Sequence, residues 1–240
     1  PEEEEEAVKG NAVYVDHPTD ESNRNFSILP AHIILTDELQ LLFQRMFVDG
    51  LHEYMKRPTL YEFTSALQKA EDQLIHCDNE QCKAYYYYKD GQDQICPWCD
   101  EKKHQVCMIK LVETTNISDD LLEDGKLKVS RYLSQIILND EAKAIYRRHV
   151  ESYVSQDSDA VVAIVKRVDP DRLILKNSST SSFLIINKVT RSRHELKPNE
   201  AKEINIHNDH VVVDVKRNVE DIQEIFGENN TLKSIVFINK

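Results

Sequence analysis

The chain has 240 residues, of which 40% are hydrophobic and 30% are charged, a balance typical of a globular protein with a buried core. With 30 basic and 42 acidic residues, the formal net charge is -12, which disfavours non-specific binding to nucleic acids. No apolar run approaches the ~18 residues of a membrane-spanning helix. The chain opens with Pro1 followed by glutamates, whereas a signal peptide begins with a positively charged segment. We therefore expect no membrane partner and a cytoplasmic location.

Two amphipathic helices are predicted in the first third of the chain, after a polar and turn-rich stretch over residues 1–30. The first helix covers residues 36–50, with Thr36 as N-cap and Gly50 as a stop signal. The second covers residues 59–75, directly after Pro58. Its apolar stripe consists of Leu60, Phe63, Leu67, Ala70 and Leu74.

The remainder of the chain is predicted to be rich in strands. Residues 108–112 favour a short strand, residues 126–138 a strand or a helix, and residues 141–154 a helix. A polar linker at residues 155–159 precedes many short β-prone runs, which indicate a small sandwich or barrel. These runs cover residues 161–168, 173–175, 183–186, 204–206, 211–215 and 234–238, with one short helix expected at residues 219–226.

The strongest chemical signal is a set of four cysteines, Cys77, Cys82, Cys96 and Cys99, arranged as two close pairs. Two such pairs separated by a hairpin-sized segment fit one tetrahedral zinc ion, because each pair directs two thiolates at a single point. The four tyrosines at residues 85–88 favour a strand between the pairs, which gives a zinc ribbon in outline. With all four positions filled by sulfur, the site is closed and structural, with no open position for a catalytic water.

Other interpretations of this segment stay open. The cysteines could instead form disulfides or be unrelated buried thiols, although a reducing cytosol disfavours disulfides. Cys107 is interpreted as a small buried apolar residue, since a fifth ligand would be redundant. The tyrosines could stack on nucleic-acid bases, but residues 76–110 hold five lysines and six acids, with no basic stripe.

The helical segment and the ribbon together resemble the end of a protein kinase. Phe43, Phe47 and Gly50, then Arg57-Pro58-Thr59, match the last helices of a kinase C-terminal lobe, where Arg-Pro-Thr opens the final helix. The whole run, about residues 11–100, is similar to bacterial Ser/Thr kinase-like proteins in which these helices lead directly into a Cys-Pro-Trp-Cys ribbon. Some of these belong to stress- or tellurite-resistance phosphorylation modules. The resemblance implies that Arg57 pairs with a glutamate near the end of the activation segment.

This chain lacks the catalytic motifs of a kinase. It contains no Gly-rich loop with its strand lysine, no His-Arg-Asp loop and no Asp-Phe-Gly. Because phosphoryl transfer depends on those parts, we expect no enzymatic activity from it. The carboxylate partner of Arg57 is missing for the same reason, and the acids at residues 2–6 are a candidate replacement. The alternative is an ordinary helical hairpin in which Arg-Pro-Thr occurs by chance.

A second resemblance lies in the C-terminal strands. Residues 183–187, 196–200 and 204–206 resemble the closing half of a forkhead-associated domain, which reads phosphothreonine through loop side chains. The resemblance implies a phosphate site here, and the compact basic cluster suited to it is Arg191, Ser192, Arg193 and His194, with further hydroxyls from Ser178, Ser179 and Thr180. The early Gly-Arg element of the family is not visible. The alternative is a hairpin turn with solvated arginines.

The sequence therefore predicts an α+β, multi-domain chain. Residues 1–75 form the kinase-like helical segment, residues 76–107 the zinc ribbon, residues 108–156 an α/β connector and residues 157–240 the β-sandwich. The expected role is non-catalytic regulation or docking in a phosphorylation or stress-response system, with phosphoproteins or other module components as partners. The alternative is a zinc-ribbon adaptor or a nucleic-acid-binding module, and an enzyme with an unrecognised site is a third class.

Overall fold

The computed structural model describes residues 2–115, 129–138, 142–151, 158–213 and 231–239. The chain divides into two compact units, Pro1–Lys103 and His104–Lys240. Within the described residues, helices are few and short, strands form several antiparallel sheets, and the chain is therefore α+β. None of the described helices has the length and apolar character needed to cross a bilayer.

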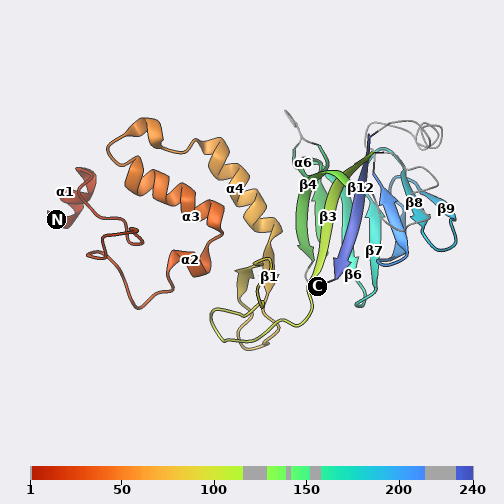
Figure 1. Cartoon of the computed structure of the whole chain (residues 1–240), viewed down its shortest axis with the longest axis horizontal. Coiled ribbons are helices and arrows are strands. Elements are labelled where there is room, and N and C mark those ends of the chain that lie inside the picture. The colour runs from red at the N-terminus through yellow and green to blue at the C-terminus, as the bar shows by residue number, and fades with distance from the viewer. Residues whose placement is uncertain (1, 116–128, 139–141, 152–157, 214–230, 240) are drawn as a thin grey trace. The chain divides into compact units, whose positions relative to one another are not determined.

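The first unit is built from helices followed by a small hairpin (Figure 1). Both predicted helices are present, and the first ends in a turn of π-helix, labelled η1. The stretch expected to be a loop over residues 1–30 begins with a short helix. The helical elements are α1 (Glu2–Val8), α2 (Ala31–Ile34), α3 (Asp37–Gln44), η1 (Arg45–Asp49), the 3-10 turn η2 (Tyr54–Lys56) and α4 (Leu60–Asp72).

Helices α3 and α4 pack against each other around four buried residues, Leu39, Leu42, Ala66 and Ala70. The rings of Phe43 and Phe63 meet edge to face, with centroids 5.8 Å apart. Salt bridges join Arg45 to Glu62 at 2.7 Å and Lys69 to Glu38 at 2.8 Å. Arg45, just after α3, thus pairs with the start of α4, whereas Glu38 at the start of α3 pairs with the last turn of α4. The two helices therefore form an antiparallel hairpin.

The predicted apolar stripe of α4 is wrong at two positions. Leu60 is 86% exposed and Leu67 is 55% exposed, whereas the small side chain of Ala66 is buried. The helices approach each other through the alanines Ala66 and Ala70, and this close approach leaves the larger leucines on the outer side of α4.

The ribbon follows α4 directly and contains two three-residue strands, β1 (Leu74–His76) and β2 (Tyr85–Tyr87). They pair antiparallel, with Leu74 opposite Tyr87 and His76 opposite Tyr85. The strand expected among the four tyrosines is therefore confirmed. Two strands of this length have almost no apolar interior of their own, so the ribbon needs another source of stability.

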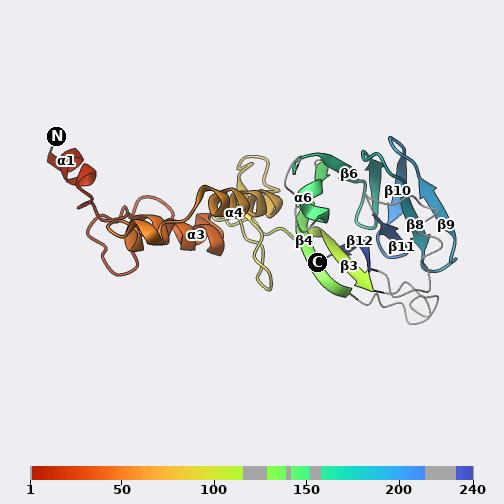
Figure 2. The ribbon, with the colours of Figure 1, turned by 90° about the horizontal axis from the view of Figure 1, so that it is seen from above.

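The second unit contains two antiparallel sheets (Figure 2). The six-stranded sheet has the order β4-β3-β12-β11-β8-β9, and the four-stranded sheet has the order β10-β7-β6-β5. The strands are β3 (Cys107–Thr115), β4 (Val129–Leu138), β5 (Lys143–Tyr146), β6 (Val161–Arg167), β7 (Arg172–Asn177), β8 (Phe183–Asn187), β9 (Arg193–Leu196), β10 (Ala201–Asn205), β11 (Asp209–Val212) and β12 (Thr231–Asn239). One short helix, α6 (Arg147–Val150), follows β5.

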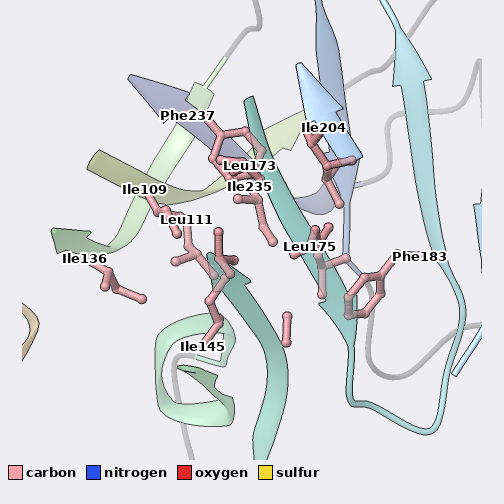
Figure 3. Close-up of a cluster of buried hydrophobic side chains, with 14 of the residues drawn as sticks. Ile109, Leu111, Ile136, Ile145, Leu173, Leu175, Phe183, Ile204, Ile235 and Phe237 are labelled. Atoms are coloured by element: carbon pink, nitrogen blue, oxygen red, sulfur yellow. The ribbon is translucent and has the colours of Figure 1, made fainter. Parts of the chain in front are cut away.

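The core of this unit lies between the two sheets. Alternate residues of the six-stranded sheet, such as Ile109, Phe183 and Ile235, cluster with Leu173 and Leu175 of the four-stranded sheet (Figure 3). Strand β7 follows the period of two expected for a half-buried strand, because its residues alternate strictly between exposed and buried. Two antiparallel sheets that share one core are the arrangement expected of a β-sandwich, and this unit is called the sandwich below.

The predicted boundary between an α/β connector (residues 108–156) and the sandwich does not occur in the structure. Strand β3 pairs along its whole length with β12 at the far end of the chain, and β5 pairs with β6. Of the helix expected over residues 141–154, the described residues 142–151 contain α6 alone, because Ile145 is fully buried in the sandwich core as part of a strand. The helix predicted at residues 219–226 lies outside the described residues.

Candidate metal centre

The four predicted cysteines converge on one point in the ribbon. Their sulfur atoms all lie within 4.8 Å of one another. The Sγ atoms of Cys77 and Cys99 are 3.5 Å apart, and those of Cys82 and Cys96 are 3.7 Å apart. Four thiolates around one zinc ion, each at about 2.3 Å, would have sulfur–sulfur distances of about 3.8 Å. The cluster therefore has the size of a tetrahedral zinc site.

Each cysteine pair forms a tight turn whose backbone closes on itself. In the first turn, the Cys77 N–H donates to the Ala84 carbonyl at 2.8 Å, and the Cys82 N–H donates to the Asn79 carbonyl at 3.0 Å. In the second turn, the Cys96 N–H donates to the Glu101 carbonyl at 2.9 Å. In both turns, the amide of the first cysteine donates to the carbonyl two residues after the second cysteine, so the backbone holds the two cysteines of each pair close together.

Backbone amides point at three of the sulfur atoms. The Asn79 N–H donates to Cys77 Sγ at 3.4 Å. The amides of Ala84 and Glu101 likewise bond the sulfurs of Cys82 and Cys99. The bond from Glu101 is the main reason that the pKa of Cys99 is lowered, whereas the bond from Ala84 opposes burial and neighbouring thiols, which together raise the pKa of Cys82. Donors of this kind stabilise the thiolate over the thiol, which is the form that binds a metal ion.

The residues that aim two of these amides have left-handed backbone conformations. Lys83 has φ 50° and Asp100 has φ 58°, and each directly follows the second cysteine of its pair. A left-handed residue at this point reverses the chain, so that the next amide faces the preceding sulfur. Sequence inspection did not single out these two positions, although their shared place after Cys82 and Cys99 is a signal that could have found them.

Burial opposes ionisation of Cys77 while the cluster holds no cation. Cys77 and Cys96 are almost completely buried. Burial is the main reason that the pKa of Cys77 is raised to about 12, with a smaller rise from the neighbouring thiols. A divalent cation would reverse this balance, since it compensates the negative charge of the sulfurs and displaces their protons.

Lys103 ties the two turns together. Its ammonium group is nearly buried, forms an ion pair with Asp78 and donates to the His76 carbonyl at 3.3 Å. Its own backbone N–H donates to the Gln94 carbonyl at 2.9 Å. Because these partners flank both cysteine pairs, Lys103 fixes the distance between the turns that supply the ligands.

The donor set fits a structural metal ion such as zinc. Four sulfur ligands in a tetrahedral arrangement are typical of zinc. The disulfide alternative does not fit, because all five cysteines are free and the short sulfur contacts exceed the ~2.05 Å of a disulfide bond. Cys107 lies outside the cluster and is buried in the sandwich core, in agreement with its predicted role as a small apolar residue.

Arg57, the kinase-like arginine, makes different contacts from those that the resemblance implies. Its guanidinium donates to the carbonyl oxygens of Gly50 at 2.7 Å and Leu51 at 2.9 Å. The acids of α1 that are the candidate replacements pair elsewhere, since Glu5 and Glu6 form salt bridges with Lys9. Within the described part of the chain, Arg57 thus caps the turn between α3 and α4.

The predicted phosphate cluster lies on the hairpin between β8 and β9. Arg191, with φ 58°, and Ser192 are in its turn, where Ser192 Oγ lies 2.9 Å from Thr190 Oγ1. Arg193 and His194 are in β9, a strand that sequence inspection missed, so their side chains leave opposite faces of the sheet. All four residues are exposed. The four side chains do not converge on one point, and phosphate binding there stays a prediction.

The chain matches no protein-family model, no curated protein and no solved structure.

Proposed function

We propose that this chain is a non-catalytic docking region whose first unit is held together by one structural zinc ion. The observation that carries the proposal is the convergence of four free cysteine sulfurs within 4.8 Å. When bound, the ion supplies a rigid cross-link between the two ends of the ribbon. With four thiolate ligands, it keeps no open position at which a substrate or a reactive water would bind.

Exposed apolar side chains on the helical unit support a docking role. Tyr54, Met55, Leu60 and Tyr61 are all strongly exposed, and they lie within a single eight-residue stretch that runs from η2 into the first turn of α4. Apolar side chains gathered in this way are typical of interaction sites rather than of surface loops. Tyrosine suits such a surface especially well because it combines a large apolar ring with a polar tip.

We assign this docking region to the C-terminal part of a bacterial Ser/Thr kinase-like protein in a phosphorylation or stress-response system. In support, Thr59 of the Arg-Pro-Thr motif opens α4, and the ribbon begins two residues after that helix ends. Under this assignment, the exposed surface at Tyr54–Tyr61 docks against the rest of a kinase-like lobe. Nucleic acid is the weaker alternative, because the unit carries 10 basic and 21 acidic residues.

The β-sandwich is the part to which we assign recognition of a phosphorylated partner. Arg147 supports this role better than the cluster at residues 191–194, since its buried Nε has no hydrogen-bond partner within the described residues. Such an orphaned donor costs about 1–3 kcal/mol, which an anion would offset. The Arg147 amide donates to the Ala160 carbonyl and the Ser178 amide to the Val162 carbonyl, so the two loops flank the start of β6.

The zinc proposal is tested by metal analysis of the purified chain together with a titration with Mg-ATP. We expect about one zinc per chain, released by a thiol-modifying reagent, and no binding of Mg-ATP. A chain without zinc in which Cys77 and Cys82 form a disulfide would overturn the metal site. Saturable Mg-ATP binding would overturn the non-catalytic assignment.

The phosphoprotein proposal is tested with a panel of phosphothreonine peptides and their unphosphorylated forms. We expect binding that requires the phosphate and that Arg147→Gln weakens at least tenfold, while Arg191→Gln leaves it unchanged. If Arg191→Gln weakened binding and Arg147→Gln did not, the phosphate site would be the cluster at residues 191–194 instead. If no phosphopeptide binds, the sandwich has another partner.

A further inference from the structure

The helical hairpin and the ribbon share one small side-chain cluster. Its buried members are Leu39, Leu42, Ala66 and Ala70, and Tyr87 of β2 packs against them. Two of the four buried residues are alanines, which remove little apolar surface from water. Leu35, Phe43 and Phe63 of the helical unit also pack against the cluster, and Tyr87 is the one packed side chain among them that comes from the ribbon.

The end of α4 is also held by the ribbon backbone. The Tyr88 N–H donates to the Gln73 carbonyl at 2.8 Å, at the C-cap of the helix. One residue later, Leu74 pairs with Tyr87 across the two strands. In addition, Lys89 Nζ donates to the His32 carbonyl on α2 at 3.0 Å. The ribbon thus contacts both α2 and the end of α4.

Neither part has the size to be stable alone. Helices of 13 and 8 residues, such as α4 and α3, are marginal in water without tertiary contacts. The ribbon has two three-residue strands, and sites with four cysteine ligands commonly fold only when the metal binds. The loss of order in one part therefore removes contacts on which the other part depends.

From these contacts we infer that metal binding by the four cysteines folds the helical hairpin as well as the ribbon, with Tyr87 as the main link. This inference rests on the proposed zinc site and adds a regulatory consequence to it. The exposed surface at Tyr54–Tyr61 is formed only in the metal-loaded chain, so removal of the ion abolishes docking at a distance from the cysteines.

Hydrogen exchange of the full chain, read by mass spectrometry, tests the coupling. The zinc-loaded chain is compared with the same chain after chelation under reducing conditions. We expect the amides of residues 66–72 in α4 to lose protection at least tenfold after chelation. Peptides covering β7 and β8 of the sandwich serve as the internal reference and keep their protection.

Two tyrosine truncations separate the coupling from the metal site. Tyr87→Ala keeps all four cysteines, so we expect the variant to bind one zinc per chain and yet to lose protection in α4. Tyr85→Ala is the matched control, because Tyr85 is half exposed on the same strand, and its ring contacts that of His76, with centroids 5.0 Å apart, rather than the helical cluster. It should behave like the unchanged chain.

The outcomes distinguish the two proposals. If the chain binds no zinc, the proposed function fails. If it binds zinc but α4 stays protected after chelation, the metal site stands and the coupling is overturned. If the metal-free chain aggregates, the zinc-loaded Tyr87→Ala variant decides, since full protection of α4 in that variant contradicts the inference.

Discussion

At the scale of single residues, the metal site depends on backbone conformation as much as on the cysteines. Lys83 and Asp100 occupy left-handed conformations that non-glycine residues adopt only with strain. Their conformation places the amides of Ala84 and Glu101 against the sulfurs. The cysteine spacing alone indicated the ligands, but this supporting geometry became visible only in the folded chain.

Replacing Lys83 or Asp100 should therefore change zinc affinity according to how readily the new residue adopts the left-handed conformation. Lys83→Gly and Asp100→Gly should leave zinc affinity unchanged or slightly higher, because glycine adopts the conformation without strain. Lys83→Val and Asp100→Val should weaken zinc binding by about 1–3 kcal/mol, since a β-branched residue resists it. Competition with a chromophoric chelator measures both effects, and equal affinities for the glycine and valine variants would contradict the account.

His210 is a buried histidine that makes the sandwich sensitive to acid. It is 5% exposed on β11, and its Nε2 has no hydrogen-bond partner in the described part of the chain. Burial, with a smaller contribution from the charge of Lys188, lowers its pKa from 6.5 to about 3. The folded sandwich therefore holds this imidazole neutral under conditions where the unfolded chain protonates it.

The free energy of unfolding of the sandwich should consequently fall as the pH drops below 6.5 towards 3. Above pH 6.5 both states are neutral at this residue and its contribution is constant. In His210→Leu, the pH dependence should be shallower by up to about 1.4 kcal/mol per pH unit. Denaturant titrations at several pH values measure this slope, with exposed His194→Gln as the control; an unchanged slope in His210→Leu would show that the histidine does not titrate on unfolding.

At the scale of elements, the N-terminal ends of α3 and α4 were the best predicted feature, whereas α4 ends at Asp72 rather than at residue 75. Thr36 accepts a hydrogen bond from the Leu39 amide, and Thr59 forms a capping box with Glu62. These are local interactions between residues three positions apart, so they can be read from sequence. The Glu62 carboxylate takes bonds from the Thr59 backbone, the Arg45 guanidinium and the Thr59 hydroxyl, in that order of effect, and they lower its pKa to about 2.

Removing the cap should destabilise the first unit. Thr59→Ala deletes the hydroxyl that accepts from the Glu62 amide, and we expect a loss of about 1 kcal/mol in the free energy of unfolding. Thr64→Ala, at an exposed position within the same helix, is the matched control and should be neutral or slightly stabilising. Thermal unfolding of the zinc-loaded chains compares them, and equal losses for both variants would rule out the cap as the cause.

Several elements were beyond reach because long-range pairing overrides local pattern. Residues 143–146 have a weak helical signal but pair with β6, which buries Ile145. Strand β9 contains Arg193, His194 and Glu195, whose polarity conceals its pairing with β8. In α4, the predicted apolar stripe placed Leu60 and Leu67 in the contact with α3, but Ala66 and Ala70 form it.

At the scale of the whole molecule, the charge distribution indicated more than one unit but not the boundary. The acidic excess was assigned to residues 1–156, whereas the structural division falls after Lys103. The first unit has 10 basic and 21 acidic residues, so it holds nearly all of the excess. The sandwich joins β3 to β12 across more than a hundred residues, which no local pattern encodes.

The central claim is that four cysteine sulfurs hold one zinc ion, and X-ray absorption at the zinc edge tests it most directly. For the chain as purified, we predict one zinc with four sulfur neighbours at about 2.3 Å and no nitrogen or oxygen ligand. A first shell that contains nitrogen or oxygen, or a chain that retains no zinc after purification under reducing conditions, would contradict the account.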